Sequence, residues 1–417
     1  MRSHYKRIGD YVTLIKLKNT DGAISSLKGI NINKHFMPSV ANVNGTDLST
    51  YRVVKKNQFA FNPMHVGRDE VLPISMLEDD ESIIVSPAYV VFEVKDEEEL
   101  LPAYLMMWCR RYEFDRNAWF MTDNSVRGGF SWADFCDMKL PVPSIEKQHE
   151  IVREYNVVKD RISLNEQLTQ KLEDTAQTIY KQWFVDFEFP ISKEYADAIG
   201  KPELEGKPYK SSGGDMMYDV GSDNDIPAGW NVYAIDDVAD VIDSMHKTPT
   251  YSSSGKSMVR VTDVNGSYLD LTGTLKVDNK VFSEFTSKYA PKRGDVVLTR
   301  VGTYGVCSYV GTDTPFCLGQ NTVVINPIKL DGSLLFFMLK SGAIKEQIEE
   351  GVTGSTQKTI SLKLIRQLRL VLPRNFESFS YLQNPFSAIT NKGELLVEEN
   401  SKLRQMKEVI LSSLSKA

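Results

Sequence analysis

Long apolar runs and clustered cysteines are both missing from this sequence of 417 residues. No apolar stretch approaches the ~20 residues that cross a bilayer, and the opening segment MRSHYKRIGDYV lacks the apolar region of a secretory leader. The four cysteines, Cys109, Cys136, Cys307 and Cys317, form no CxxC motif and no Cys/His cluster. We therefore expect a cytoplasmic protein with reduced thiols, no membrane partner and no zinc site.

Recognisable catalytic motifs are missing as well. Gly255-Lys256-Ser257 resembles the end of a phosphate-binding loop, but Thr250 stands where the first glycine belongs. Asn384-Pro385-Phe386 lacks the second proline of the adenine-methyltransferase signature. We expect it instead to start a helix, with Asn384 as N-cap and Pro385 in the first turn. The five histidines show no ligand spacing. The sequence therefore predicts a chain that is not an enzyme, with no catalytic residue, bound metal or cofactor of its own.

The net charge is concentrated in one segment. The chain has 49 basic and 55 acidic residues, a net charge of −6 that at first argues against a nucleic-acid-binding protein. Residues 186–229, however, hold 4 basic and 10 acidic residues and so carry the whole deficit. The same segment is rich in glycine and proline and has little periodicity, which predicts an acidic extended connector. The rest of the chain is close to neutral and can present basic faces locally.

The chain contains one internal repeat. Phe130–Pro143, FSWADFCDMKLPVP, matches Ile360–Pro373, ISLKLIRQLRLVLP, at a constant difference of 230 positions. Each copy is typical of a short helix followed by a strand that ends at proline. Upstream, Tyr104-Leu105 pairs with Phe337-Met338 at a difference of 233. The repeat favours two similar modules that bind two similar targets, although an old duplication without functional meaning stays open.

Each half of the chain ends in a segment with helical periodicity. Apolar residues recur every three or four positions within 144–185, interrupted by Asn165, and again within 376–417, where Gly393 weakens the pattern. A helix of this length spans about 60 Å, too long for a small core. Two narrow apolar seams predict that the helices pack against each other as a coiled coil and act as a spacer.

Several loops combine glycine with amide, hydroxyl and basic side chains. DNSVRGG (Asp123–Gly129) and TGSTQKT (Thr353–Thr359) lie at equivalent places, just before the matched helix of each repeat. TRVGTYG (Thr299–Gly305) has a rough counterpart in FNPMHVGR (Phe61–Arg68), and HKTPTYSSSGK (His246–Lys256) adds two lysines. Glycine permits close backbone approach, Gln can pair with adenine, and Arg or Lys can reach guanine or phosphate. An ordinary glycine turn stays the alternative for each loop.

These loops supply the candidate DNA-binding residues. They are Arg127, Gly128, Gly129, Ser355, Thr356, Gln357, Lys358, Arg300, Thr303, Tyr304, His65, Arg68, Lys247 and Lys256.

A family resemblance follows from a set of segments in fixed order. They are LPVPSIEKQHEIV (Leu140–Val152), IYKQWFVDFEFP (Ile179–Pro190), GKPYKSSGGDM (Gly206–Met216), IPAGW (Ile226–Trp230) and TGSTQKTIS (Thr353–Ser361). With the internal repeat, they resemble the specificity (S) subunits of type I restriction-modification systems over essentially the whole chain. One departure is LVLPRNFESFSYLQNPF, which replaces in the second repeat the proline-then-EKQ pattern of the first.

The resemblance implies an α+β fold with two similar target-recognition domains in a pseudo-twofold arrangement. These domains would cover residues 1–143 and 230–375. Two long antiparallel helices, at 144–185 and 376–417, would separate them as a coiled-coil spacer. Each domain would recognise one half of a split DNA sequence, and the helices would set the gap between the halves.

The resemblance also implies partners. Two modification subunits would dock on the helices and would supply S-adenosylmethionine (SAM) for adenine methylation in host defence. Trp183 and Phe184 are candidate anchors for these subunits, with the alternative that both only close the core at the helix end. Restriction subunits using ATP and magnesium would join this complex on double-stranded DNA. Two alternatives are a self-sufficient methyltransferase, against which the missing motifs argue, and a coiled-coil assembly adaptor that does not touch DNA.

Overall fold

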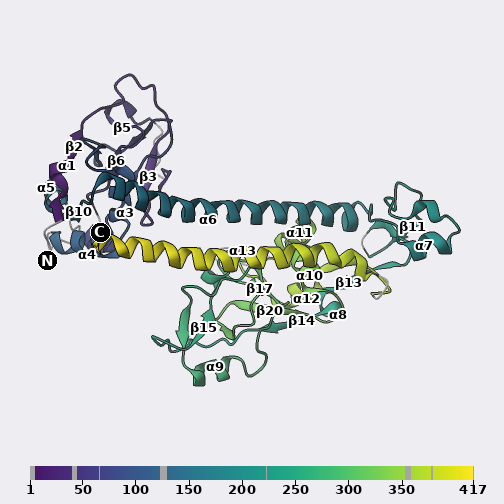
Figure 1. Ribbon diagram of the computed structural model, residues 1–417. Coiled ribbons are helices and arrows are strands. Elements are labelled where there is room, and N and C mark those ends of the chain that lie inside the picture. Colours follow the sequence, from purple (N-terminus) through teal and green to yellow (C-terminus); the bar gives the residue numbers. More distant parts are fainter. Residues whose placement is uncertain are drawn as a thin grey trace. The chain divides into compact units, whose positions relative to one another are not determined.

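The computed structural model describes residues 5–39, 45–64, 66–122, 129–221, 223–352, 358–376 and 379–416, without the side chains of Gly67 and Arg68. Helices and strands are mixed along the chain (Figure 1). The chain divides into two compact units. Unit 1 is Met1–Ile162 with Lys402–Ala417, and unit 2 is Ser163–Ser401. Within the described ranges, no helix combines the length and apolar character that crossing a lipid bilayer requires.

Unit 1 is built around an antiparallel sheet of strand order β2-β9-β6-β7. A second pairing joins β1 to β10, so the first strand of the unit meets the strand that precedes the long helix. Its elements are β1 (Tyr5–Arg7), α1 (Ile8–Tyr11), β2 (Val12–Ile15), β3 (Lys28–Ile30), β4 (Phe36–Pro38), η1 (Leu48–Thr50), β5 (Arg52–Val54), β6 (Phe59–Phe61), α2 (Val66–Asp69), β7 (Ile74–Met76), β8 (Ile83–Val85), β9 (Val90–Val94), α3 (Pro102–Cys109), α4 (Tyr112–Met121), α5 (Trp132–Asp137) and β10 (Lys139–Pro141).

Unit 2 repeats this plan with the sheet order β14-β20-β17-β18 and the pair β13-β21. Beside these, unit 2 has the sheet β16-β15-β19, and unit 1 has the strand pairs β3-β4 and β5-β8. Its elements are β11 (Met216–Asp219), β12 (Asn224–Pro227), β13 (Trp230–Ala234), α8 (Ile235–Val238), β14 (Ala239–Asp243), β15 (Lys256–Val259), η4 (Val261–Asp263), β16 (Leu275–Val277), α9 (Asn279–Phe285), β17 (Val296–Thr299), β18 (Cys307–Tyr309), β19 (Phe316–Leu318), β20 (Thr322–Pro327), α10 (Gly332–Leu339), α11 (Gly342–Gly351), α12 (Leu362–Gln367) and β21 (Arg369–Pro373).

The matched helices of the two repeats begin with the same local chemistry. Ser131 caps α5 by accepting a hydrogen bond from the Asp134 N–H at 3.1 Å, and Ser361 caps α12 from the Leu364 N–H at 3.1 Å. A serine at this position satisfies one of the free N–H groups of a helix start. The duplication predicted from the sequence is therefore present in the fold.

One predicted pairing within the repeat is wrong. The helices α3 and α10 begin at Pro102 and Gly332, and α4 and α11 at Tyr112 and Gly342, each pair 230 residues apart. The predicted difference of 233 for Tyr104-Leu105 therefore misses the register by three residues. Nearly every residue of α3 and all residues of α10 are buried. Because such helices are apolar on every face, they have no apolar stripe by which the two sequences could be aligned.

Two long helices follow the two repeats. They are α6 (Ile145–Tyr180), continued by the π-helical turn η2 (Lys181–Val185), and α13 (Ser380–Ser413), continued by η5 (Leu414–Lys416). In unit 2, Asn165 bonds to Asn400 and the Trp183 ring contacts that of Phe386. Residue numbers therefore rise along α6 as they fall along α13, which makes the helices antiparallel as expected.

The helix α13 begins within the predicted segment 376–417 but ahead of the predicted N-cap, Asn384. It starts at Ser380, so Pro385 lies inside the helix and not in its first turn. Phe379 and Leu382 are buried in the core of unit 2 together with Phe386. This packing favours the earlier start, although a proline inside a helix removes one backbone donor.

The predicted extended connector is folded. Residues 186–229 contain α7 (Lys193–Ala198), η3 (Pro202–Leu204) and the β11-β12 hairpin. Phe189 stacks between Tyr209 and Trp230, with ring centroids 4.6 and 5.0 Å apart. A few well-spaced aromatic side chains supply a core that average composition does not reveal, because each ring buries a large apolar area.

Candidate nucleic-acid interface

The candidate loops come together in pairs, in the same way in both units. In unit 2, the Ile360 N–H donates a 3.0 Å hydrogen bond to the carbonyl of Arg300. In unit 1, the N–H of Phe130, the repeat counterpart of Ile360, donates a 3.0 Å hydrogen bond to the carbonyl of Pro63. The segment before the capped helix therefore meets, in each unit, the loop that follows a central strand (β17 or β6). The sequence predicted these loops as candidates, but it did not predict that they contact each other.

In unit 1 the two loops border a shallow hollow. Its lining includes Pro63 and Met64 from one loop, and Thr122 and Gly129 from the other. Gly129 is exposed, and a Cβ atom at this position would meet nothing within 4 Å. Among the candidates, Arg127, Gly128 and His65 lie outside the described residues. Arg68 lies in α2, and its side chain is not described.

In unit 2 three side chains form a polar cluster at the loop pair. The Tyr304 hydroxyl donates to the Glu349 carboxylate, at 2.9 Å from Oε1 and 3.1 Å from Oε2. Lys358 Nζ lies 3.3 Å from Tyr304 Oη and 3.5 Å from Glu349 Oε2. These bonds raise the pKa of the Lys358 ammonium, with the Tyr304 hydroxyl as the main cause. Lys358 is therefore a cation on an exposed surface, held in place by a tyrosine and a glutamate.

Of the remaining candidates in these two loops, one is described by the structure and three are not. Thr303 is exposed, and its carbonyl accepts a bond from the Thr299 hydroxyl. Ser355, Thr356 and Gln357 lie outside the described residues. Glu349 was not predicted, because it is one of several glutamates in α11 and the sequence does not show which of them meets the loop.

Arg300 departs from the prediction that it faces DNA. Its side chain is only 14% exposed, and its Nη1 lies 2.8 Å from Asp243 Oδ1. Its Nε donates to the carbonyl of Ile360 at 3.1 Å. The guanidinium therefore holds the two loops and β14 together through its Nε and Nη1 groups. Arg300 is a structural residue of the interface.

The two lysines of the 246–256 loop differ in environment. Lys247 is exposed and forms an ion pair of 2.5 Å with Glu284. Lys256 is half-buried and begins strand β15, opposite Val277. Gly255 has a φ of +127°, and a Cβ there would lie 2.1 Å from the Val277 carbonyl oxygen. Gly255 is therefore needed where the backbone turns tightly into β15, and it does not form a phosphate-binding loop. Of the two lysines, Lys247 is more accessible to a DNA ligand than Lys256.

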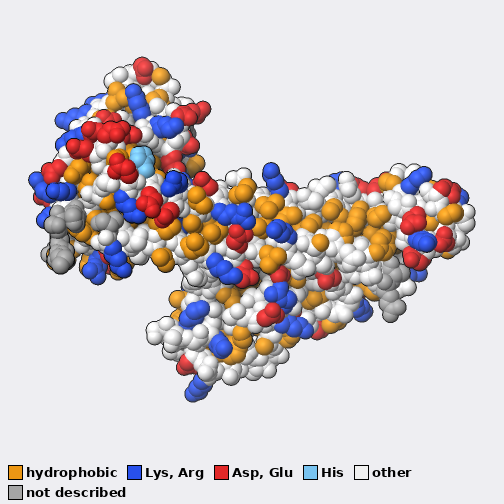
Figure 2. Space-filling view, in the orientation of Figure 1, with side chains coloured by type: hydrophobic (Ala, Val, Ile, Leu, Met, Phe, Trp, Pro, Cys, Tyr) orange, Lys and Arg blue, Asp and Glu red, His pale blue; other side chains and the backbone are white. Residues whose placement is uncertain are grey.

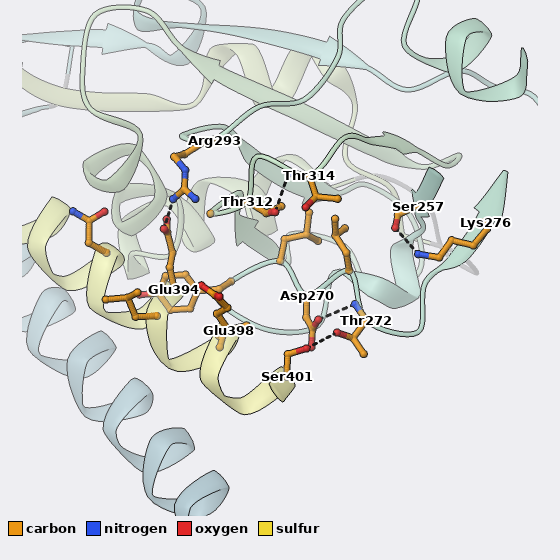
Figure 3. Close-up of a pocket in the computed structure, with 17 residues that line it drawn as sticks. Ser257, Asp270, Thr272, Lys276, Arg293, Thr312, Thr314, Glu394, Glu398 and Ser401 are labelled. Atoms are coloured by element: carbon orange, nitrogen blue, oxygen red, sulfur yellow. Dashed lines mark hydrogen bonds and ion pairs between the residues drawn. The ribbon is translucent and has the colours of Figure 1, made fainter. Parts of the chain in front are cut away.

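A groove in unit 2 lies between its strand-rich part and α13 (Figure 3). Arg293 forms ion pairs with Asp313, at 3.2 Å, and with Glu394 of α13. The Thr272 hydroxyl lies 3.2 Å from that of Ser401, also on α13. The Arg293–Glu394 ion pair and the Thr272–Ser401 contact therefore attach the strand-rich part of unit 2 to α13.

The aromatic residues predicted as partner anchors are largely part of the core. Phe184 is 3% exposed and contacts the rings of Tyr180, Trp230, Phe379 and Phe386. Trp183 is half-buried, edge-on to Phe386 with centroids 6.2 Å apart. Phe184 therefore closes the end of the helix pair, and only Trp183 presents part of its side chain to solvent.

One face of the molecule is not dominated by either sign of charge. On the face shown in Figure 2, Lys and Arg side chains are interspersed with Asp and Glu. Broad, salt-sensitive attraction to phosphates is therefore not the main property of this face, and local clusters such as the one at Lys358 gain importance.

Comparison with known proteins gives consistent results. Residues 227–394 match the family described as the type I restriction modification DNA specificity domain. The type I restriction enzyme HindI specificity subunit of Haemophilus influenzae is 22% identical over 431 residues, covering 92% of this chain and 91% of that protein. The crystal structure of the type I restriction-modification S subunit from M. genitalium has a TM-score of 0.51 at 12% identity, covering 98% of this chain and 95% of that one.

Proposed function

We propose that the chain, which is similar in sequence to the specificity subunits of type I restriction-modification systems, recognises a bipartite DNA target as the non-catalytic subunit of such a complex. Each recognition unit contacts one half of the target through its paired loops. The observation that carries this is the equivalent hydrogen bond, Phe130 to Pro63 and Ile360 to Arg300, which assembles a loop pair in each unit. Two similar binding surfaces on one chain suit a target with two halves.

The long helices have two roles in this proposal. They set the number of unread bases between the half-sites, because a helix resists bending and has a constant rise per residue. They also dock the two modification subunits. The antiparallel contacts of Asn165 with Asn400 and of Trp183 with Phe386 support a stiff pair.

Cofactors belong to the partners in this proposal. The modification subunits bind SAM and methylate adenine, the restriction subunits use ATP and magnesium, and this chain supplies neither site. The complex acts in the cytoplasm, where the DNA is. The partner subunits contribute most phosphate contacts, which accounts for the modest basic character of this chain.

Methylome sequencing tests the proposal. The chain is expressed with its neighbouring modification subunit in cells that lack this system, and the DNA is mapped for methyladenine. We expect a split motif with methyladenine in each half. An assembled complex that leaves no new methylation would favour the adaptor alternative, and methyl transfer by the isolated chain would favour the enzyme.

The same assay tests the helix spacer. An equal insertion into α6 and α13 should change the gap between the half-sites and leave the half-sites themselves unchanged. An unchanged gap would contradict the spacer role.

A further inference from the structure

We propose that Glu349 is a positioning residue for DNA binding by unit 2: its carboxylate holds Lys358 against Tyr304 in the free protein and releases it to a DNA phosphate. The inference rests on the proposed function, because it needs the Lys358 loop to meet DNA. It goes beyond that function by assigning an acidic residue that competes with DNA for the same ammonium group.

The geometry shows an ordered chain of donors. Lys358 Nζ donates to Tyr304 Oη at 3.3 Å, and the tyrosine hydroxyl donates in turn to Glu349 at 2.9 Å. The ammonium also lies 5.8 Å from the centre of the Tyr304 ring, within the range of a cation–π contact. The lysine is therefore oriented by a neutral hydroxyl, a ring and a carboxylate at once.

Tyr304 is the rigid part of the cluster. Its loop is closed by the Gly305 N–H, which donates to the Thr299 carbonyl at 2.9 Å, and by the Val306 N–H, which donates to the Thr299 hydroxyl at 3.1 Å. Gly302 and Gly305 have φ values of +78° and +75°, a conformation that favours glycine. The Tyr304 ring packs against the core of unit 2. The hydroxyl is thus fixed in position before any ligand arrives.

Lys358 and Glu349 are the exchangeable part. Their side chains are 55% and 56% exposed, so water weakens their attraction and the ammonium can change partner at little cost. A phosphate offers the same charged oxygen acceptors as a carboxylate and binds an ammonium in the same way. Once a phosphate takes the ammonium, Glu349 faces a like charge. The glutamate therefore orders the lysine in the free protein and lowers its affinity for phosphates that do not sit correctly.

The cluster of Lys358, Tyr304 and Glu349 is found in unit 2. At the difference of 230 that relates the repeats, the residue of unit 1 equivalent to Glu349 is Trp119, and the residue equivalent to Lys358 is Gly128. The first unit therefore lacks both charged members at these positions, and the effect of Glu349 should be confined to the half-site that unit 2 reads.

Binding measurements on the complex with the modification subunit test the inference. The probes are a labelled duplex carrying the motif found by methylome sequencing and a scrambled duplex of equal length. Glu349→Gln keeps an acceptor for Tyr304 and removes the charge. We expect it to tighten binding of the scrambled duplex by about two- to fivefold, the range that exposed ion pairs allow. Glu350→Gln is the matched control, because Glu350 lies beside Glu349 in α11, is exposed, and has no side-chain hydrogen bond or ion pair with the part of the chain that the structure describes.

A second variant separates the inference from the proposed function. Lys358→Gln should weaken DNA binding, and Glu349→Gln should have no further effect in that background, because the glutamate acts through the lysine. Equal effects of Glu349→Gln and Glu350→Gln would overturn the inference, as would an unchanged affinity in Glu349→Gln while Lys358→Gln weakens binding. If Lys358→Gln binds DNA like the wild type, the proposed role of this loop in DNA binding fails instead. Thermal unfolding of each variant checks that the fold is retained.

Discussion

The side-chain amide of Asn165 donates a 2.9 Å hydrogen bond to the side-chain oxygen of Asn400, and the two residues are 1% and 5% exposed. They belong to α6 and α13 in unit 2, where the surrounding seam is mainly apolar. A buried polar pair in such a seam favours one register, because any shift leaves both amides without their partner. Asn165, which interrupts the apolar pattern in the sequence, thus favours one register of α6 against α13 in unit 2.

We expect Asn165→Leu to lower the free energy of unfolding by about 1–3 kcal/mol, because Asn400 loses a buried donor. The double variant with Asn400→Leu should recover most of this loss, since two leucines pack without polar cost. Urea unfolding of the full chain measures both. A single variant as stable as the wild type would contradict a role for this hydrogen bond.

Gly393→Ala should destabilise the protein although alanine favours helices. A Cβ at Gly393 would lie 2.2 Å from the Tyr268 ring, so the helix approaches this ring where only glycine fits. We expect a loss of about 1–3 kcal/mol, as for overpacked cores, against a gain of about 1 kcal/mol expected from helix propensity alone.

The control for this prediction is Gly342→Ala in α11, where a Cβ would meet nothing within 4 Å. It should leave stability unchanged or slightly raised in the same thermal unfolding assay. A stabilised Gly393→Ala variant would show that Tyr268 moves aside without cost.

Arg300 and Lys358 should separate stability from DNA binding. Arg300→Met removes the guanidinium partner of Asp243 and the bond to the Ile360 carbonyl, so we expect a loss of about 1–3 kcal/mol of stability.

Lys358→Ala should unfold like the wild type but bind DNA more weakly, with a salt dependence reduced by about one phosphate contact. Arg127→Ala should also weaken DNA binding. Calorimetry and DNA titrations at several salt concentrations distinguish the two classes.

Phe184→Ala should cost about 3–5 kcal/mol, because it removes a large buried ring from the end of the helix pair. Trp183→Ala should cost less stability and reduce assembly with the modification subunit, which gel filtration of the mixed proteins measures. Intact assembly by Trp183→Ala would show that this residue, like Phe184, serves only the core.

The cysteines should report on unfolding. Burial raises the pKa of the Cys109, Cys307 and Cys317 thiols to about 12, which leaves almost no reactive thiolate at mildly alkaline pH. Cys136 is half-buried, and burial also raises its pKa. In the native protein, iodoacetamide should therefore modify Cys136 before the others, and urea should expose all four to it. Peptide mass spectrometry locates the modified sites, and early modification of Cys307 would contradict its burial in β18.

Local patterns predicted much of the fold. Ser131 and Ser361 precede matching apolar spacings, and both cap helices, because a serine followed by that spacing specifies a helix start from its own neighbours. The long seams predicted α6 and α13 for the same reason. The predicted N-cap at Asn384 was wrong, since Phe379 and Leu382 pack into a core that the local pattern does not show and the helix begins at Ser380.

The sequence by itself determined the duplication, the two long helices and the absence of a recognisable catalytic motif, because each is a local pattern; the duplication is one such pattern that recurs 230 positions later. Only the tertiary structure decided that residues 186–229 fold, that Arg300 holds loops together and that Glu349 meets Tyr304 and Lys358. These outcomes depend on which distant side chains share a buried space or a hydrogen bond. The spacing of residues along the chain does not encode such contacts until the sheets bring the loops together.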